Sequence, residues 1–371
     1  MTEARYASPM SFAAGADAFA ALHVGVATRG FVANIDARVE TIEAGRLTLP
    51  VTVNDANSLN AWVCSPLTTY SRYALEETRR VAPRLIAPPL AGVIGIADRW
   101  MRRAELDCAV SLNNWLISTN LYPRADGIDF DALASACQHR WPHHAIWFRS
   151  LNFEQHADWL HALVAAGFEL IPTRQVYLFR DMQQKATRHQ NLQRDLQLLR
   201  TTPLTPVAHD AFTYTDFARA ETLYAQLYID KYSHLNPRYT AAFLNAWHAA
   251  GLLEFAGFKD DTGTLRAVVG MFGQASVLSA PIVGYDTSWP QSAGLYRLLM
   301  AHVLKTTIER DAQLNLSAGA AHFKRLRGGE PAIEYSAVFS RHLSAATRRT
   351  LNGLRILTTK LGVPIMRRFQ L

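Results

Sequence analysis

The chain has 371 residues, of which 49% are hydrophobic, 10% aromatic and 19% charged. This composition excludes general disorder and predicts a folded α/β or α+β protein with enough residues for two domains. The net charge of +7 comes from the last segment, because residues 341–371 carry seven Lys or Arg and no Asp or Glu, while the rest of the chain carries 31 charges of each sign.

The cysteines and the N-terminus bear on the compartment. Cys64, Cys108 and Cys137 stand far apart, without CxxC spacing and without histidines at metal-site spacing, which is typical of a reducing compartment. Asp17 interrupts the apolar run at 11–27, which argues against a signal peptide, and no stretch reaches the ~20 apolar residues of a membrane span. We expect a cytoplasmic protein without a metal site.

The N-terminal half alternates strands and helices. In chain order we predict a hairpin over 31–54, a strand over 107–118, a helix over 129–140, a strand over 145–150, a helix over 154–167 and a strand over 168–180. A connecting helix is expected from Met182 to about Leu199, because Leu192, Leu196 and Leu199 share one helical face. This alternation is typical of an α/β layer architecture.

The C-terminal half repeats this order. We predict helices over 213–232 and 238–250, strands over 252–259, 264–274 and 276–286, a helix over 295–309, a strand over 313–317, a short basic helix within 317–329 and a strand over 332–341. Gly167 and Gly328, 161 positions apart, each stand between a helix end and a strand with aromatic residues. Two copies of one fold would explain this repeat and the length.

Residues 293–329, AGLYRLLMAHVLKTTIERDAQLNLSAGAAHFKRLRGG, resemble the Fem-like branch of the GNAT superfamily, which includes peptidyl transferases and other bacterial acyltransferases. A glycine opens the long helix, and Phe323, Lys324 and Gly328 supply the aromatic–Lys pair and the later glycine of that branch. The resemblance covers residues 130–340. It implies an α/β (α+β) chain of two tandem GNAT-like domains, each a mixed twisted sheet flanked by helices.

The resemblance also implies a division of the chain. The expected parts are an N-terminal domain with its extension at 1–181, a linker helix at 182–206, a donor-binding domain at 207–342 and a basic amphipathic tail at 343–371.

The same resemblance implies a donor site at the loop before the long helix. Gln291 and Gly294 match the family's phosphate loop, whereas Tyr296 replaces its last small residue. Helix N-termini favour anions, and the alternative is a plain turn before a helix. The expected cofactor is a coenzyme A thioester or the phosphopantetheine of an acyl carrier protein, bound by Ile282, Val283, Gly284, Gln291, Ser292, Ala293, Gly294, Leu295 and Tyr296.

The basic half-turn is the second predicted site. The resemblance assigns Lys324 to a polyanionic substrate or a developing oxyanion, and we expect its side chain to be exposed; the alternative is a solvated basic turn. Candidate bases are Glu254, Asp286, His322 and Glu334, and candidate acids are Tyr285 and Tyr335. Because Glu334 and Tyr335 lie on opposite strand faces, at most one of them points into the cleft. Candidate substrate-binding residues are Lys231, His234, Arg238, Lys185 and Arg188.

These features predict an N-acyltransferase that moves an acyl group from a thioester donor to an amine-bearing small molecule in the cleft between the domains. One alternative is an aminoacyl-tRNA-dependent peptidyl transferase, against which the neutral charge outside the tail argues, since tRNA requires a basic face. Another is a non-catalytic GNAT-fold binding protein. Tyr296, and Phe323 where many GNATs have a tyrosine, leave that second alternative open.

The tail has a helical stripe of apolar residues, Leu351, Leu354, Leu357 and Leu361, before Gly362 and Pro364 break the period. Arg348, Arg349, Arg355 and Lys360 are interleaved with that stripe. Three interpretations stay open. The stripe packs on the second domain, the tail binds an acyl carrier protein, or it binds anionic lipid and places the protein peripherally at the inner membrane face.

Overall fold

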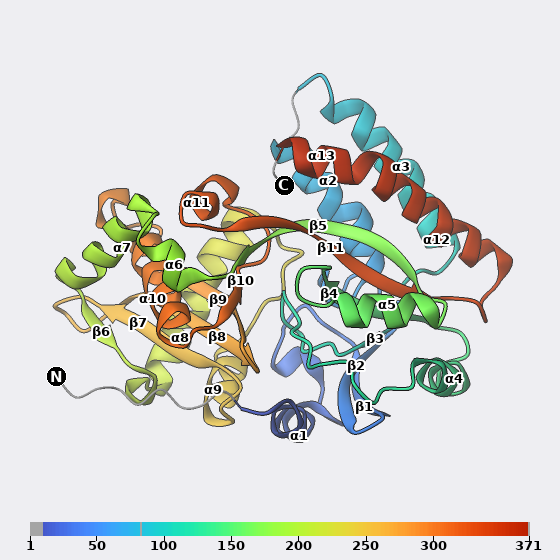
Figure 1. Cartoon of the computed structure of the whole chain (residues 1–371), viewed down its shortest axis with the longest axis horizontal. Coiled ribbons are helices and arrows are strands. Elements are labelled where there is room, and N and C mark those ends of the chain that lie inside the picture. The colour runs from blue at the N-terminus through green and yellow to red at the C-terminus, as the bar shows by residue number, and fades with distance from the viewer. Residues whose placement is uncertain (1–9, 82–83, 370–371) are drawn as a thin grey trace.

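The computed structural model describes residues 10–81 and 84–369 (Figure 1). Its strands form one mixed sheet in the order β1-β2-β3-β4-β11-β5-β10-β9-β8-β7-β6. Their bounds are β1 Arg38–Ala44, β2 Leu47–Asp55, β3 Cys108–Leu112, β4 Ala145–Leu151, β5 Glu169–Phe179, β6 Thr205–Val207, β7 Glu254–Lys259, β8 Leu265–Gln274, β9 Val277–Tyr285, β10 Gln313–Asn315 and β11 Glu330–Phe339.

Helices flank this sheet, so the expected α/β class is confirmed. The α-helices are α1 Phe12–His23, α2 Ala74–Val81, α3 Ala87–Arg103, α4 Phe130–Arg140, α5 Ala157–Ala165, α6 Met182–Ala186, α7 Gln190–Thr201, α8 Tyr214–Tyr224, α9 Ala241–Ala249, α10 Leu295–Glu309, α11 Ala321–Arg325, α12 Ala345–Leu357 and α13 Val363–Phe369. Three π-helical turns extend or join them, η2 Thr68–Tyr73, η4 Ala225–Tyr232 and η6 Thr358–Gly362.

The two halves of the chain exchange their last strands. In each half two strands joined by a helix pair in parallel, β3 with β4 and β9 with β10. The strand that follows then crosses over: β5 pairs antiparallel with β10, and β11 pairs antiparallel with β4. β5 and β11 also pair with each other, and Figure 1 shows them running through the middle of the molecule. Both halves therefore meet in one continuous sheet.

The exchanged strands are the segments that the sequence repeat relates. β5 begins at Glu169 and β11 at Glu330, which is the spacing of 161 that separates Gly167 from Gly328. The two halves share an order of elements, β3-α4-β4-α5-β5 in the first and β9-α10-β10-α11-β11 in the second. The domain bounds inside 1–342 stay a prediction, because the sheet crosses them.

The faces of the sheet in the second half are covered by different helices. Along β8, Val268 and Phe272 belong to the apolar cluster that contains α8, whereas Val269 and Met271 belong to the cluster that contains α10. Since successive side chains of a strand point to opposite faces, α8 and α10 lie on opposite sides of the sheet. This two-sided cover explains why the strand is apolar along its length.

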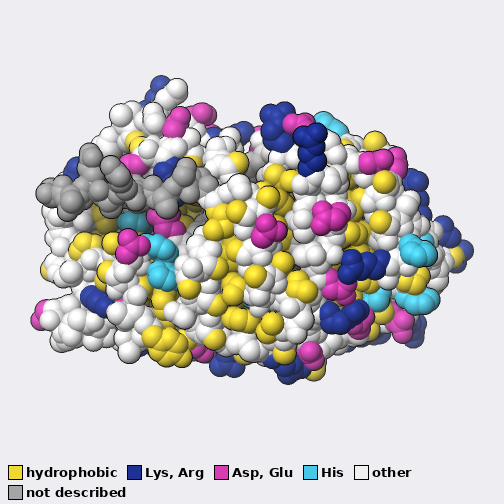
Figure 2. All heavy atoms as spheres, turned by 90° about the horizontal axis from the view of Figure 1, so that it is seen from below, with side chains coloured by type: hydrophobic (Ala, Val, Ile, Leu, Met, Phe, Trp, Pro, Cys, Tyr) yellow, Lys and Arg dark blue, Asp and Glu magenta, His cyan; other side chains and the backbone are white. Residues whose placement is uncertain are grey.

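Helix α1 joins the two halves from below. Phe19 is fully buried, with its ring 5.4 Å from that of Trp115 in the first half and 6.0 Å from that of Trp247 in the second. His23, at the end of α1, accepts a hydrogen bond from Trp247 Nε1 at 2.8 Å, and burial lowers its pKa to about 4, so the ring is a neutral acceptor. In Figure 2, seen from the α1 side, hydrophobic side chains gather across the middle of the face.

Several boundaries differ from the predictions. The strand expected over 107–118 ends at Leu112, because Asn113 and Leu116 take left-handed backbone conformations. The single connecting helix is two helices, α6 and α7. The tail does not stop at Gly362: helix α12 continues through a π-helical turn into α13, and Pro364 lies just after that turn.

Candidate functional site

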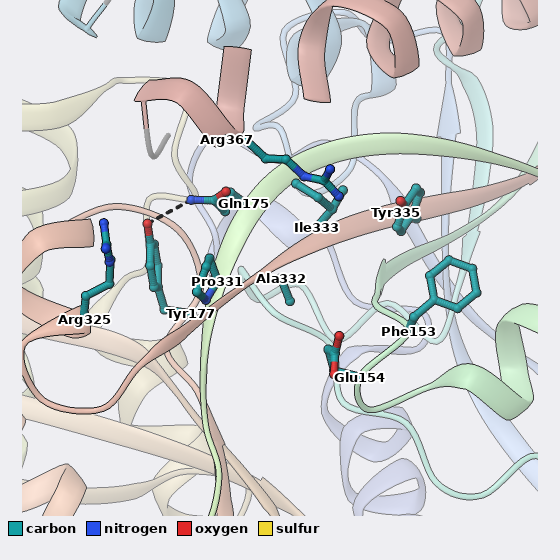
Figure 3. Close-up of a pocket in the computed structure, with 10 residues that line it drawn as sticks. All are labelled: Phe153, Glu154, Gln175, Tyr177, Arg325, Pro331, Ala332, Ile333, Tyr335 and Arg367. Carbon is teal, nitrogen blue, oxygen red and sulfur yellow. Dashed lines mark hydrogen bonds between the residues drawn. The ribbon is translucent and has the colours of Figure 1, made fainter. Parts of the chain in front are cut away.

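A cavity, called the larger cavity below, opens over the exchanged strands (Figure 3). Its volume is about 450 Å³, which is the size of a small-molecule site. The lining comes from the β4–α5 loop, β5, α11, β11 and α13, with the residues Phe153, Glu154, Gln175, Tyr177, Arg325, Pro331, Ala332, Ile333, Tyr335 and Arg367. Residues of both halves and of the tail therefore meet in one cavity.

Two phenols and two guanidinium groups give this cavity its chemistry. Gln175 donates from Nε2 to the Tyr177 oxygen at 2.9 Å, and the ring of Tyr335 lies edge-on to that of Phe153. Burial raises the pKa of both phenols, although Arg325 acts in the opposite direction on Tyr177 and Arg367 does so on Tyr335. The phenols are therefore protonated near neutral pH. The lining carries two positive charges, Arg325 and Arg367, and one negative charge, Glu154, and this net positive charge favours an anionic ligand.

Lys324 differs from its prediction. The expectation of an exposed side chain is wrong: 3% of the residue is exposed, and Nζ donates to the carbonyl oxygens of Leu316, Ser317 and Ala318 at 2.7, 3.2 and 2.8 Å. Left-handed backbone at Ser317, Gly319 and Ala320 folds this turn around the ammonium. Burial, and secondarily the charge of Arg174, lower the pKa of Lys324 to about 7. The Lys324 ammonium group is therefore stabilised by the partial negative charges of backbone carbonyl oxygens.

Two of the carboxylates proposed as bases lie in ion pairs. Both oxygens of Glu254 accept from Arg310 Nη2 at 2.7 and 2.6 Å. Asp286 pairs with Arg219 at 2.7 Å and with Arg266 at 2.8 Å. Although burial raises its pKa, hydrogen bonds from Ser288 and these guanidinium groups hold the pKa of Asp286 below its usual value. Neither carboxylate lines the larger cavity, so neither is placed to act on a ligand there.

The remaining acid–base candidates separate as expected for one strand. Tyr335 lines the larger cavity, whereas Glu334 is buried on the other face of β11 and lines a smaller cavity, where Arg174 holds it at 2.8 and 3.1 Å. His322 is exposed on α11, and Tyr285 packs 6.2 Å from the ring of Tyr296. Of the seven candidates, Tyr335 is the one in the larger cavity.

The predicted substrate-binding residues lie elsewhere. Lys231, His234, Arg238 and Arg188 are exposed outside the larger cavity. Lys185 pairs with Glu330, which Arg180 also holds at 2.5 Å, so this lysine fixes the start of β11. The cavity residues that sequence reasoning missed, such as Gln175 and Arg367, lie far apart in the chain and carry no shared motif.

The donor loop keeps part of the expected geometry. Gly294 has a φ of 64° and caps α10, and β9 pairs with β10 over only three residues, so that the following stretch with Ile282 and Val283 diverges from β10. Gly284 serves packing instead, because a Cβ there would lie 2.7 Å from the backbone nitrogen of Tyr224. The loop residues Gln291, Ser292 and Ala293 form a short 3₁₀ turn before Leu295.

The space beside Gly294 limits what this loop can hold. A Cβ at Gly294 would lie 3.1 Å from Leu198 Cδ2, so Leu198 of helix α7 occupies the space next to the glycine. Arg297 in the first turn of α10 pairs with Asp195 of α7 at 2.8 Å, and the ring of Tyr296 lies tilted against that of Phe323, 4.9 Å away. The helix N-terminus suits a phosphate, and Leu198 of α7 lies beside the glycine that opens it.

Within residues 10–81 and 84–369, no three His, Cys, Asp or Glu side chains come together as a metal-binding group. In that same part of the chain, every helix falls short of the length and apolarity needed to span a bilayer.

No protein-family model matches the chain, and no curated protein matches it. Solved structures with a similar fold include L-PGS from Bacillus licheniformis, with 13% identity over 60% of this chain and 76% of that one and a TM-score of 0.43. FemX has 10% identity over 57% of this chain and 79% of its own, with a TM-score of 0.44. A tandem GNAT protein from the clavulanic acid biosynthesis pathway has 10% identity over 62% of this chain and 75% of its own, with a TM-score of 0.36. Function must therefore be inferred from this chain's own residues.

Proposed function

We propose that the chain is an N-acyltransferase whose amine-bearing acceptor binds in the larger cavity. The observation that carries this proposal is the position of Tyr335, a protonated phenol in a cavity of about 450 Å³ that Arg325 and Arg367 also line. Acyl transfer to a neutral amine forms a C–N bond, breaks the donor's C–S bond and moves one proton from the amine nitrogen to the departing thiolate. Tyr335 is the side chain placed to hold that proton.

The arginines supply binding rather than proton transfer. Arg325 on α11 and Arg367 on α13 stand on the rim, as Figure 3 shows, and guanidinium groups stay charged at any physiological pH. They suit an acceptor, or a donor arm, that carries a carboxylate or phosphate. A thioester of coenzyme A or of an acyl carrier protein is the proposed donor.

A non-catalytic binding protein of the same fold is the second candidate. The contact between the Gly294 position and Leu198 favours it, because α7 occupies part of the donor cradle. In that case the larger cavity binds a small anionic ligand without turnover. We also propose that the tail binds an acyl carrier protein or a lipid surface. Arg367 of the tail lines the larger cavity, so such a contact would lie next to the proposed site.

The test combines a binding and a turnover measurement. Wild-type protein is incubated with acyl-CoA or acylated carrier protein and a panel of amines, and thiol release is followed together with product mass. We expect turnover that falls ~10²-fold or more in Tyr335→Phe, because a positioned acid contributes that much. Tyr214→Phe, at a phenol 67% exposed on α8, is the matched control and keeps full activity.

The outcomes separate the two candidates. Equal turnover in Tyr335→Phe and Tyr214→Phe would remove Tyr335 from the chemistry. If no donor gives thiol release but a small anion raises the melting temperature and Arg325→Ala abolishes that rise, the binding-protein candidate replaces the enzyme.

A further inference from the structure

The smaller cavity lies on the other face of the exchanged strands, under the segment from Trp62 to Tyr73. Its floor comes from four neighbouring strands, β3, β4, β11 and β5, and its roof from the segment that ends in η2. A bulge at Thr173, where the pairing of β5 with β11 shifts by one residue, turns Thr173 and Arg174 towards the same face. The cavity is small, about 10 Å³, which is room for one small occupant.

Two residues of the floor carry buried N–H groups that point to an occupant. Among the described residues, neither Arg149 Nη2 nor Trp147 Nε1 has a hydrogen-bond partner, and the two residues are 9% and 1% exposed. They stand at alternate positions of β4 and so share one face. A buried donor left without a partner costs ~1–3 kcal/mol. Both orphaned groups are donors, so the occupant must be an acceptor.

The buried charges around this cavity leave one positive charge uncompensated. Arg149 donates from Nη1 to the neutral amide oxygen of Asn114 at 2.9 Å and stacks on Trp62. Arg174 stacks on the same indole, and its own charge is balanced by Glu334. Burial, and secondarily the charge of Arg174, lower the pKa of Arg149. The single carboxylate Glu334 pairs with Arg174, and within the described residues no carboxylate forms an ion pair with Arg149, so the two guanidinium groups share one negative charge.

The other polar groups of the cavity are neutral. Burial raises the pKa of Cys64 to about 11 and that of Tyr70 to about 12, so both are protonated at neutral pH. The hydroxyl groups of Tyr70, Thr173 and Ser336 form a chain with oxygen separations of 3.2 and 3.3 Å, and they can turn to donate. A water in the cavity could accept from both N–H groups, but it would leave the excess positive charge without a counter-ion.

We propose that this cavity is a second binding site, independent of the transferase proposal, and that it takes a small monovalent anion of the size of chloride held by Arg149 and Trp147. One anion satisfies both orphaned donors and balances the excess charge. Ser336 of the paired strand β11 lines the same cavity, so the anion lies where β4 of the first half meets β11 of the second. Bound anion therefore stabilises the junction of the halves.

The experiment uses the full chain and bromide as a probe that diffraction can identify. Crystals soaked in sodium bromide are measured at the bromine absorption edge, and melting temperatures are recorded in sodium chloride and in sodium gluconate at equal ionic strength. We expect an anomalous peak between Trp147 and Arg149, and a saturable rise of a few degrees in chloride that gluconate does not give.

The variants remove one donor while keeping the ring. Trp147→Phe is expected to lose the peak and at least half of the chloride-dependent rise, while Trp100→Phe, at an indole 55% exposed on α3, keeps both. Arg149→Met serves as a second test if Trp147→Phe does not fold. An ordered water without an anomalous peak would overturn the proposal, as would an equal chloride-dependent rise in Trp147→Phe and Trp100→Phe.

Discussion

A lysine in a run of basic residues can be a structural group, as Lys324 shows. Its neighbours Arg325 and Arg327 differ from it: Arg325 reaches the rim of the larger cavity, and Arg327 pairs with Asp195 of α7. Lys324 instead closes the turn that precedes α11, with three carbonyl oxygens around Nζ. Each cation of the half-turn thus has a separate role, and that of Lys324 bears on stability.

The free energy of unfolding should depend on pH through Lys324. Because the folded pKa is about 7 and the ordinary value is 10.5, the unfolded chain binds a proton between these pH values that the folded chain does not. The free energy of unfolding therefore rises with pH from 7 to 10.5 and has no such slope below 7. We expect Lys324→Met to lose this contribution to the slope, measured by urea unfolding at several pH values.

Arg325→Met is the control, because Arg325 is exposed one position further along α11. Its slope between pH 7 and 10.5 should match that of the wild type. Identical slopes in Lys324→Met and the wild type would mean that Lys324 has an ordinary pKa in the folded protein.

The burial of Lys324 could not be predicted from its sequence context. A run of three basic residues before Gly-Gly is typical of a solvated turn, and the carbonyl groups that surround Nζ are backbone atoms with no sequence signal. The alternation along β11 did predict that Glu334 and Tyr335 face opposite sides, since period two is a local property. Arg149 offered a signal that was not used, an arginine inside the otherwise apolar segment AIWFRSL.

At the scale of elements, α1 explains part of the N-terminal region to which sequence reasoning assigned no role. Its buried face contacts both halves through Phe19 and His23, and a Cβ at Gly15 would lie 3.4–3.5 Å from Gln274 of β8 and from Trp115. A short helix of small residues can lie this close to the sheet because it has few bulky side chains. The helix therefore closes the shared core at the junction of the halves.

Phe19→Ala should destabilise the protein strongly. Removing a fully buried ring between Trp115 and Trp247 leaves a cavity, and the expected loss is ~3–5 kcal/mol of the free energy of unfolding. Urea unfolding followed by tryptophan fluorescence measures it. Val24→Ala, at a side chain 44% exposed just beyond α1, should change stability by less than ~0.5 kcal/mol; a comparable loss in both variants would argue against α1 as the joining element.

The tail is a second element with a divided surface. Leu351 and Leu354 are buried in a cluster with Met101 of α3, Ile171 of β5 and Val338 of β11, whereas Ile356 is 43% exposed. The apolar stripe predicted from sequence thus packs on the protein at its first two positions, and not against the second half alone. Periodicity located the stripe, but it does not specify which partner covers it.

Leu354→Ala should lower the free energy of unfolding by ~2–5 kcal/mol, because the leucine is 5% exposed in a packed cluster. Ile356→Ala, two positions further on, should leave stability within ~0.5 kcal/mol of the wild type. Thermal and urea unfolding of both variants measure the difference. If the two variants are equally stable, the tail does not depend on this contact and is available to a partner.

At the scale of the whole molecule, the exchange of β5 and β11 decides how the chain can be divided. The order of elements in the second half followed from local apolar patterns and turns, which is why it could be predicted. The crossing of the last strands could not, since nothing in the sequence of β5 specifies β10 rather than β4 as its neighbour. The same crossing builds the larger cavity, whose residues come from both halves.

The halves should therefore not fold separately. A fragment of residues 1–203 keeps β4 but lacks its neighbour β11, and a fragment of residues 204–371 keeps β10 but lacks its neighbour β5. Each fragment therefore has an unpaired strand edge. Each also contains one of the long strands β5 and β11 without the other. Exposed edges of this kind aggregate. We expect each fragment alone to be insoluble or to lack a cooperative unfolding transition.

Expressed together, the fragments should form a one-to-one complex with the circular dichroism of the intact protein, because the β5–β11 pairing and the core around α1 then re-form. A soluble, monomeric fragment that unfolds cooperatively would show that a half can close its own sheet, and the exchange would not be required for folding.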